Sequence, residues 1–169
     1  SENIIWINDI KINNSYPTVF LANEFFDALP IKQFFKRKEG WVERFVNFKD
    51  EKNAEFNEQP LDIKGVEQHL SFEISKDQKI IEYSPSSFEY LKDISNLINK
   101  NDGGILIIDY GYLSLKMEET LQAIKNHKHS NILEDIGDSD ITYNINFSFF
   151  QKFINLFYYL DSFITNQKN

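Results

Sequence analysis

The chain has 169 residues, a formal net charge of −8 at pH 7 and no cysteine. The missing cysteine excludes disulfides, thiolate metal ligands and a thiol nucleophile, while the negative charge argues against a nucleic-acid partner. No apolar run reaches the roughly 18 residues that a membrane-spanning helix needs, so no membrane span is predicted. The length and the aromatic fraction of 15% predict a single domain over residues 1–169 with an aromatic core.

The first predicted element is a strand over residues 18–22. Its short apolar run ends at the polar pair Asn23-Glu24, which indicates a strand buried on both faces of a sheet. A β-hairpin follows over residues 31–35 and 41–48, because apolar and polar side chains alternate on both sides of a charged turn that contains glycine.

The next segment combines polar and apolar stretches. Residues 49–65 are charged, rich in asparagine and interrupted by proline, which predicts an exposed loop. Residues 70–74 and 79–83 then look like two further short strands. Together with the hairpin, these strands are expected to form a small antiparallel β-layer over residues 30–84.

A helix over residues 85–99 has the strongest local signals. Ser84 suits the N-cap, a proline follows at the first helical position, and apolar side chains recur at helical spacing. Gly103 and Gly104 then open an apolar strand over residues 105–109. Helix and strand together form half of a β-α-β unit, which predicts an α/β fold.

The last third of the chain has weaker patterns. Residues 115–128 fit neither helical nor strand periodicity, whereas alternation predicts a strand over residues 141–147. A short helix is predicted at residues 148–155 and a final strand at residues 156–164. The helix-spaced phenylalanines that begin at Phe147 are interpreted as core residues rather than as a cofactor site.

Two of the predicted buried strands end in polar residues, and these ends are the first candidate for a functional site. Glu24 and Asp27 follow the first strand, and Asp109 ends the second, beside Tyr110. In open α/β sheets, ligands bind beyond the carboxyl ends of the strands. Glu24 and Asp27 could hold or deprotonate a cationic or hydroxylic substrate group. Alternatively, they could cap the following turn, with Asn23 making an Asx-type bond and Asp27 exposed.

No metal site is predicted. His127 and His129 have no clear third ligand, and the acidic residues 134–140 lack the spacing of a calcium-binding loop. The six glycines form no phosphate-binding loop, so the usual nucleotide cradle is missing from this sequence.

Several motifs, taken in order, resemble the MidA family of methyltransferases. They are Asn23-Glu24-Phe25-Phe26-Asp27-Ala28-Leu29-Pro30, Glu82-x-Ser84-Pro85, Gly103-Gly104-x-Leu106-x-x-Asp109-Tyr110-Gly111, Thr120-Leu121-Gln122-Ala123 with His127, and Asp140-Ile141-Thr142 through Asn146-Phe147. Members of this family are S-adenosylmethionine-dependent methyltransferases of bacteria and mitochondria. The mitochondrial members are assembly factors for respiratory complex I that methylate an arginine on a core subunit.

The resemblance implies a fold class. It is α/β, with a partial Rossmann-like class I methyltransferase sheet (strands 4 to 7) and the inserted antiparallel β-layer at residues 30–84. Residues 18–22 match the fourth strand, so the N-terminal donor-binding half, with its glycine-rich loop, is expected to be absent. S-adenosylmethionine is then expected to bind the complete enzyme only. The open edge at residues 18–22 is expected to pair with the missing half, with a second copy or with residues 4–12.

The resemblance also implies roles for individual residues. Asn23 and Glu24 would lie closest to the methyl donor. Glu24 and Asp27 would orient an arginine of the acceptor and make it more nucleophilic, as catalytic residues. The acceptor side would be lined by Asp109, Tyr110, Gly111 and His127.

The expected function is therefore that of the later part of a protein arginine methyltransferase. Its partner would be an acceptor protein, with a respiratory complex I subunit as the candidate. The family and the lack of a targeting signal predict a bacterial cytoplasmic location. A non-enzymatic alternative is a catalytically inactive fragment of a split gene, or an interaction module that keeps an acidic partner-binding surface. The missing glycine-rich loop favours this alternative for the isolated chain.

Overall fold

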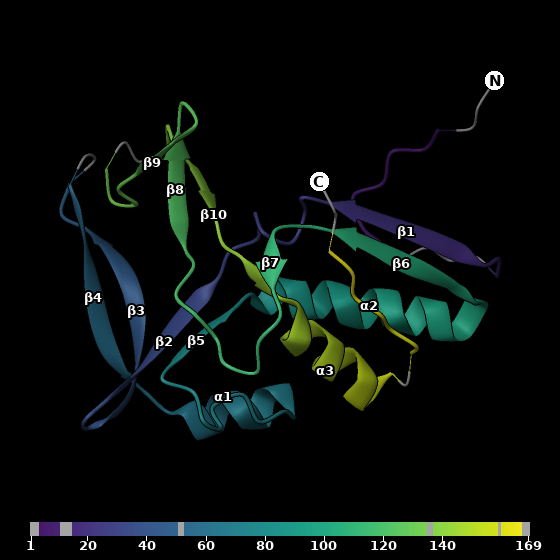
Figure 1. Cartoon of the computed structure of the whole chain (residues 1–169), viewed down its shortest axis with the longest axis horizontal. Coiled ribbons are helices and arrows are strands. Elements are labelled where there is room, and N and C mark those ends of the chain that lie inside the picture. Colours follow the sequence, from purple (N-terminus) through teal and green to yellow (C-terminus); the bar gives the residue numbers. More distant parts are fainter. Residues whose placement is uncertain (1–3, 11–14, 51–52, 135–136, 159, 167–169) are drawn as a thin grey trace.

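A computed structural model describes residues 4–10, 15–50, 53–134, 137–158 and 160–166 (Figure 1). The chain has an α/β architecture in which helices accompany several small sheets. In chain order the elements are β1 (Thr18–Asn23), β2 (Lys32–Arg37), β3 (Gly40–Phe48), β4 (Ala54–Leu61), α1 (Ile63–Leu70), β5 (Ile80–Tyr83), α2 (Pro85–Asn101), β6 (Gly103–Ile108), β7 (Gly111–Tyr112), β8 (Gln122–Lys125), β9 (Lys128–Ser130), β10 (Asp140–Thr142), β11 (Ile145–Asn146) and α3 (Phe147–Phe157).

A parallel pair of strands, β1 and β6, brings two predicted site segments together. Their register runs from Thr18 opposite Gly103 to Asn23 opposite Ile108. Helix α2 lies against one face of the pair, where Ile107 packs onto the hydrophobic core. Both predicted apolar strands are confirmed, and their carboxyl ends are neighbours.

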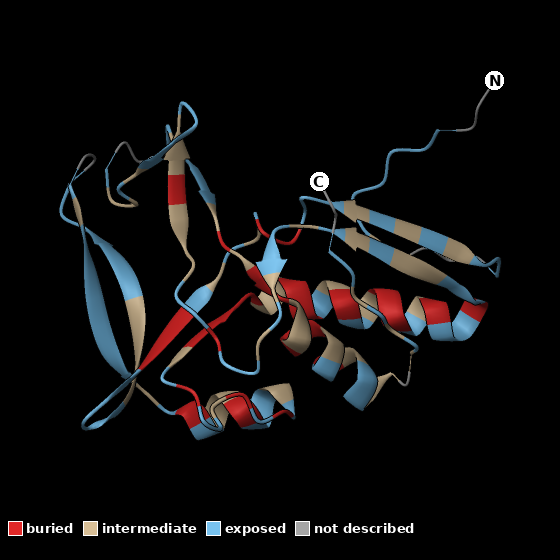
Figure 2. Cartoon of the chain, viewed as in Figure 1, coloured by how far each residue is buried: buried red, intermediate tan, exposed pale blue. Residues whose placement is uncertain are grey.

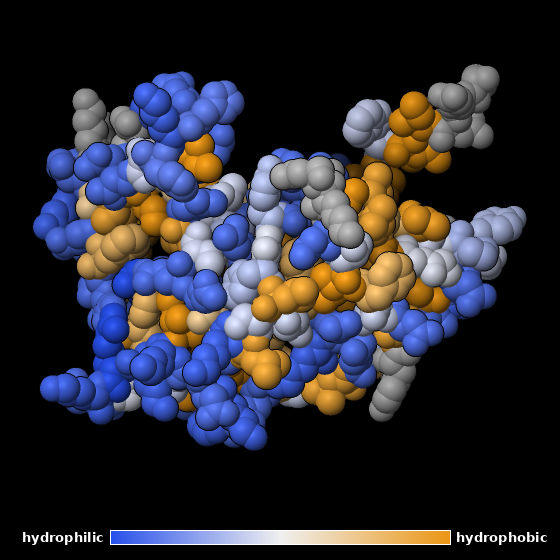
Figure 3. All heavy atoms as spheres, in the orientation of Figure 1, coloured by the Kyte–Doolittle hydropathy of each residue, from blue (hydrophilic) through white to orange (hydrophobic). Residues whose placement is uncertain are grey.

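The opposite face of the β1–β6 pair is open, so the prediction that the first strand is buried on both faces is wrong. Val19 and Leu21 of β1 are 79% and 69% exposed, and Leu106 of β6 is 55% exposed. Figure 2 shows exposed and half-buried residues alternating along both strands, and Figure 3 shows apolar surface over the same region. Among the described residues, helical cover comes from one side only.

The outer edge of β1 has no partner strand within the described part of the chain. Residues 4–10 form no strand, so the predicted pairing of this edge with residues 4–12 is wrong for the part that the structure describes. Residues 11 and 12 lie outside the described ranges. Pairing with a second chain or with a further segment of a longer protein stays a prediction.

A four-stranded antiparallel sheet, in the order β4-β3-β2-β5, lies on the left in Figure 1, well apart from the parallel pair on the right. The β2–β3 hairpin and strand β5 confirm predicted elements. The loop predicted for residues 49–65 is wrong, because β4 pairs with β3 from Phe48 opposite Ala54 to Trp41 opposite Leu61. A polar sequence suits β4, which is an edge strand with mostly exposed residues.

Helix α1 runs up to residue 70, and residues 71–74 form no strand, so the strand predicted at residues 70–74 is absent. The helix ends at Ser71, whose backbone is left-handed with φ of 53°. The following residues turn back over the helix, where the Glu67 carboxylate accepts hydrogen bonds from the backbone N–H groups of Ile74 (3.1 Å) and Ser75 (2.9 Å). The predicted strand is wrong because its backbone is satisfied by this side chain instead of by a sheet partner.

Helix α2 confirms the predicted helix and its cap. Ser84 is buried, and its hydroxyl oxygen accepts a hydrogen bond from the Ser87 backbone N–H at 3.2 Å. Replacing Ser84 with alanine removes this acceptor, and we expect the free energy of unfolding to fall by about 1 kcal/mol. Urea denaturation measures the change. Ser86→Ala, in the same helical turn but without a capping role, is the control, and equal losses in the two variants would contradict the capping assignment.

The last third of the chain forms short strands and helix α3. The segment with ambiguous periodicity, 115–128, contains β8, which pairs with β9 and β10. Asn126 and His127, both at positive φ, form the tight turn between β8 and β9. The single strand predicted over residues 141–147 is instead two short strands in different sheets, β10 and β11, and β10 begins one residue earlier, at Asp140. The strand predicted at residues 156–164 is wrong, because α3 continues into it and its other described residues form no strand.

Aromatic side chains form much of the core, as the composition predicts. The Phe88 ring of α2 contacts the rings of Phe149, Phe150 and Phe153 of α3 in edge-on geometry, with centroid separations of 5.1, 5.9 and 4.6 Å. The two helices are therefore held together by rings. None of the described helices combines the length and the apolar character that crossing a membrane requires.

Candidate functional site

The candidate site lies where β1 and β6 end side by side. Asn23, the last residue of β1, is opposite Ile108, the last residue of β6. The Glu24 backbone N–H continues the pairing by donating to the Ile108 carbonyl oxygen at 2.8 Å. Residues that are far apart in the sequence, Glu24 and Asp109, thus follow adjacent strand ends, as expected for parallel strands.

Asp109 organises the turn that follows β1. Its Oδ2 accepts hydrogen bonds from the backbone N–H groups of Phe26 (3.0 Å) and Asp27 (3.3 Å), and its Oδ1 accepts one from Tyr110 (2.9 Å). Asp109 therefore caps the turn, whereas the capping alternative gave this role to residues 23–27. That alternative is also wrong about Asp27, which it expected to be exposed and which is buried. The capping also fixes Asp27 beside Asp109.

Asp27 is the most deeply buried acid of this group, with 5% of its surface exposed. Its Oδ1 has no hydrogen-bond partner within the described residues. Burial raises the pKa of the Asp27 carboxyl, and the neighbouring charges of Asp109 and Glu24 raise it further. This carboxyl therefore holds a proton more readily than an exposed aspartate does.

Glu24 is the exposed member of the group. Its φ of 46° lies in the left-handed region, which a residue with a Cβ rarely adopts. A strained backbone conformation of this kind persists only where surrounding contacts enforce it, and such conformations cluster at functional sites. This conformation of Glu24 connects β1 to the turn at Phe26 and Asp27 that Asp109 caps.

Tyr143 is a member of the site that the sequence did not predict. Its backbone N–H donates to the Asp27 carbonyl oxygen at 3.3 Å, and its hydroxyl lies 3.4 Å from the Ser87 hydroxyl at the start of α2. Burial raises the pKa of Tyr143 to about 12, with the charges of Asp109 and Asp27 contributing. No local pattern marks this residue, because it reaches the site through tertiary packing.

Of the remaining predicted site residues, Tyr110 and Gly111 directly follow Asp109, whereas His127 lies in a distant turn. Tyr110 is 62% exposed, and Gly111 begins β7, where a Cβ would lie 2.3 Å from the Ile145 carbonyl oxygen. Gly111 therefore permits a close backbone approach. His127 is exposed in the β8–β9 turn, which Figure 1 shows well apart from the ends of β1 and β6, so the structure does not bring it to the acids.

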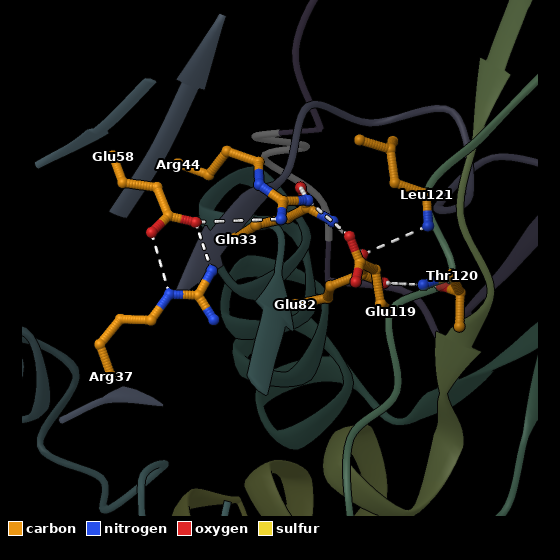
Figure 4. Close-up of polar contacts among 8 residues, drawn as sticks. All are labelled: Gln33, Arg37, Arg44, Glu58, Glu82, Glu119, Thr120 and Leu121. Carbon is orange, nitrogen blue, oxygen red and sulfur yellow. Dashed lines mark hydrogen bonds and ion pairs between the residues drawn. The ribbon is translucent and has the colours of Figure 1, made fainter. Parts of the chain in front are cut away.

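A second buried acid, Glu82 of β5, joins the antiparallel sheet to the segment before β8 (Figure 4). Its carboxylate accepts hydrogen bonds from the Gln33 side chain and from the backbone N–H groups of Thr120 and Leu121. The Thr120 hydroxyl donates to the same carboxylate at 2.7 Å and accepts a hydrogen bond from the Asn144 backbone N–H at 2.9 Å. This network therefore fixes the residue that precedes β11 and follows Tyr143 in the chain.

Arg44 of β3 lies at the outer side of the Glu82 network (Figure 4). Its guanidinium stacks 3.9 Å from the centre of the Phe35 ring and pairs with Glu119. A hollow of about 260 Å³ lies beside it, lined by Ile31, Lys32, Gln33, Glu43, Arg44, Phe45, Val46, Phe56 and Leu121. None of the predicted site residues lines this hollow, and the described residues contain no cluster of metal-ligating side chains.

Comparison with known proteins agrees with the motifs. Residues 1–162 match a family model described as "Putative S-adenosyl-L-methionine-dependent methyltransferase". The chain is 33% identical over 152 residues to the Caenorhabditis elegans homolog of the mitochondrial protein arginine methyltransferase NDUFAF7, covering 87% of this chain and 35% of that protein. It is 30% identical over 156 residues to the Danio rerio NDUFAF7, covering 88% of this chain and 35% of the relative.

A solved structure is similar in fold. It is a protein from Burkholderia thailandensis bound to S-adenosyl-homocysteine, with a TM-score of 0.62, 21% identity, and coverage of 85% of this chain and 38% of that one. The chain thus spans about a third of the length of the curated relatives that it matches. By its match to the family model over nearly its whole length, the chain belongs to the MidA-type family of S-adenosylmethionine-dependent methyltransferases.

Proposed function

We propose that this chain carries the acceptor-binding side of an S-adenosylmethionine-dependent protein arginine methyltransferase. The main support is the group of acids at the adjoining ends of β1 and β6, in a chain of this family. The parallel pairing of these strands supports their assignment to the fourth and fifth strands of a Rossmann-like sheet. The antiparallel order β4-β3-β2-β5 supports an inserted β-layer at residues 30–84 within one partial domain.

An arginine acceptor suits this group of acids. Its guanidinium is a planar cation with several N–H donors, which carboxylates bind in defined orientations. Glu24 and Asp27 are proposed as catalytic: they hold the guanidinium and take up the proton that its nitrogen loses on methylation. The acceptor side is proposed to be lined by Asp109, Tyr110 and Gly111. His127 enters the proposal only through the family motif, since its turn lies elsewhere in this chain.

The methyl donor is proposed to bind the complete enzyme. S-adenosylmethionine supplies the methyl group when bound, and Asn23 and Glu24, both exposed at the end of β1, offer an amide and a carboxylate suited to its ammonium and hydroxyl groups. Further residues are needed, because no glycine-rich donor loop occurs in the sequence. We propose that either another part of a longer protein or a second copy pairs with the outer edge of β1, which has no strand partner among the described residues.

The acceptor is proposed to be a protein, with a respiratory complex I subunit as the candidate. Support comes from the names of relatives, which describe protein arginine methyltransferases. The names of those relatives describe mitochondrial proteins, so they do not support the bacterial cytoplasmic location that was expected from the sequence.

Glu24→Gln in the full-length protein tests the proposal. Loss of the charge is expected to lower kcat/KM for an arginine-containing acceptor by about 10- to 100-fold, since hydrogen bonds to charged groups contribute about 1.5–3 kcal/mol. Transfer of labelled methyl groups measures the rate. Glu39→Gln, in the exposed β2–β3 turn, is the control and should match the wild type. A rate unchanged in Glu24→Gln would remove Glu24 from the catalytic residues.

A further inference from the structure

The inference starts from an unsatisfied oxygen. Asp27 has 5% of its surface exposed, and its Oδ1 faces no hydrogen-bond donor within the described ranges. A buried carboxylate oxygen without a donor is unfavourable, and native proteins rarely leave one. Asp27 therefore requires either a proton of its own or a donor from beyond the described residues.

Among the described residues, the charged neighbours of Asp27 are the acids Asp109 and Glu24. Asp109 faces it from the end of β6 and Glu24 from the end of β1, while Tyr143 approaches from the segment before β11. Within the described residues, no ion pair joins Asp27, Asp109 or Glu24 to a lysine, arginine or histidine. Elsewhere in the chain, acids such as Glu43 are paired. Among the described residues, the three acids therefore form a site without a paired cation. Solvent exposure falls from Glu24, which is exposed, through half-buried Asp109 to buried Asp27.

We propose that Asp27 and Asp109 form a cation site that exchanges a proton for the guanidinium of the acceptor. When the site is empty, Asp27 keeps a proton, because its carboxyl is buried beside the negative charge of Asp109. When a guanidinium binds, that proton leaves to solvent and an N–H of the guanidinium faces the free Oδ1 of Asp27. This inference rests on the proposed function, because it takes the acceptor to be an arginine.

The exchange conserves the charge of the site. Two carboxyl groups of which one keeps its proton carry a net charge of −1, and two carboxylates that bind one guanidinium also carry −1. A neutral ligand brings no positive charge, so the proton would have to remain on the site. The carboxylate without that proton would then have no cation to pair with. The planar guanidinium with its several donors can reach both carboxylates at once, which an ammonium group does less well.

The sign of the pH dependence follows from the raised pKa of Asp27. Guanidinium binds the deprotonated pair, so protons compete with it at pH values below that raised pKa. Affinity is therefore expected to be constant at high pH and to fall by up to about tenfold per pH unit as the pH drops through the pKa of Asp27.

Calorimetry on the full-length protein without methyl donor tests this exchange. The probe is a short glycine-flanked peptide with one arginine, titrated from about pH 8 to about pH 5 in two buffers that differ in ionisation enthalpy. We expect the heat to differ between buffers in the acidic range, approaching one proton released per peptide bound. The same peptide with lysine should bind at least about tenfold more weakly.

Asp27→Asn is the matched variant, because its amide can donate to Asp109 and imitates the protonated carboxyl. We expect its affinity for the arginine peptide to be at least about tenfold lower, with no proton release and a flat pH profile. Glu55→Gln, an exposed acid of β4, is the control and should retain the wild-type profile.

Difference infrared spectroscopy of the wild type provides a readout that needs no variant. At acidic pH the band of a protonated carboxyl should disappear when the arginine peptide binds. Peptide binding without proton release, or no binding at any pH, would overturn the inference. Neither result would by itself contradict methyl transfer, which the Glu24→Gln rate assay measures separately, so failure of the exchange and failure of the proposed function are distinguishable.

Discussion

Gly103→Ala is expected to destabilise the chain by at least about 3 kcal/mol, since it combines backbone strain with overpacking. Gly103 has φ of 129°, a region that residues with a Cβ rarely adopt, and it opens β6 opposite Thr18. A Cβ there would lie 1.9 Å from the Thr18 carbonyl oxygen and 2.7 Å from its nitrogen. Because both contacts are with backbone, the clash is relieved only if β1 and β6 move apart.

The neighbouring glycine is the control for this effect. Gly104 has ordinary backbone geometry, and no atom lies within 4 Å of a Cβ built on it. Gly104→Ala is therefore expected to change stability by less than about 1 kcal/mol, in the stabilising direction. Urea unfolding of the two variants measures the difference. Equal free energies of unfolding would show that the parallel register at the start of β6 is not the one described.

Glu82→Ala is expected to lower the free energy of unfolding by about 3 kcal/mol, because it leaves buried and partly buried donors without an acceptor. The Glu82 carboxylate accepts the Gln33 side-chain N–H at 2.5 Å and the backbone N–H groups of Thr120 and Leu121 at 2.9 and 3.2 Å. The methyl group of alanine replaces none of these bonds. We expect a lower free energy of unfolding and loosening of the segment that leads into β8.

Two further variants distinguish the loss of the hydrogen-bond network from the loss of a negative charge. Glu82→Gln keeps one acceptor oxygen and should lose less than Glu82→Ala. Glu58→Ala removes an exposed acid that pairs with Arg37 on the same sheet, and it should cost less than about 1 kcal/mol. Chemical denaturation compares all three. A loss in Glu82→Ala no greater than that in Glu58→Ala would mean that the buried network contributes nothing to stability.

The elements that could be predicted from the sequence are those with local causes. Ser84 and Pro85 begin α2 by capping and by preset backbone geometry, and the apolar runs at 18–22 and 105–109 became adjacent strands. Strand β4 could not be predicted, because its polar residues gain order only by pairing with β3. Helix α1 was missed for a similar reason, since it depends on tertiary contacts that composition does not reveal.

The candidate site was predicted in part. Glu24 and Asp109 could be placed together because acids at the ends of adjacent parallel strands must meet at one edge of the sheet. Tyr143 could not be found in this way, since its contact with Asp27 is a backbone hydrogen bond between distant segments. His127 was assigned from a motif, and the β8–β9 turn carries it elsewhere.

The identity of the methylated side chain tests the central claim most directly. The full-length protein would be incubated with isotopically labelled S-adenosylmethionine and a library of peptides that each contain one arginine and one lysine, followed by mass spectrometry. We expect the label on arginine with the wild type, and a loss of at least about tenfold when Glu24→Gln and Asp27→Asn are combined. Label on lysine alone, or undiminished arginine methylation by the combined variant, would contradict the account.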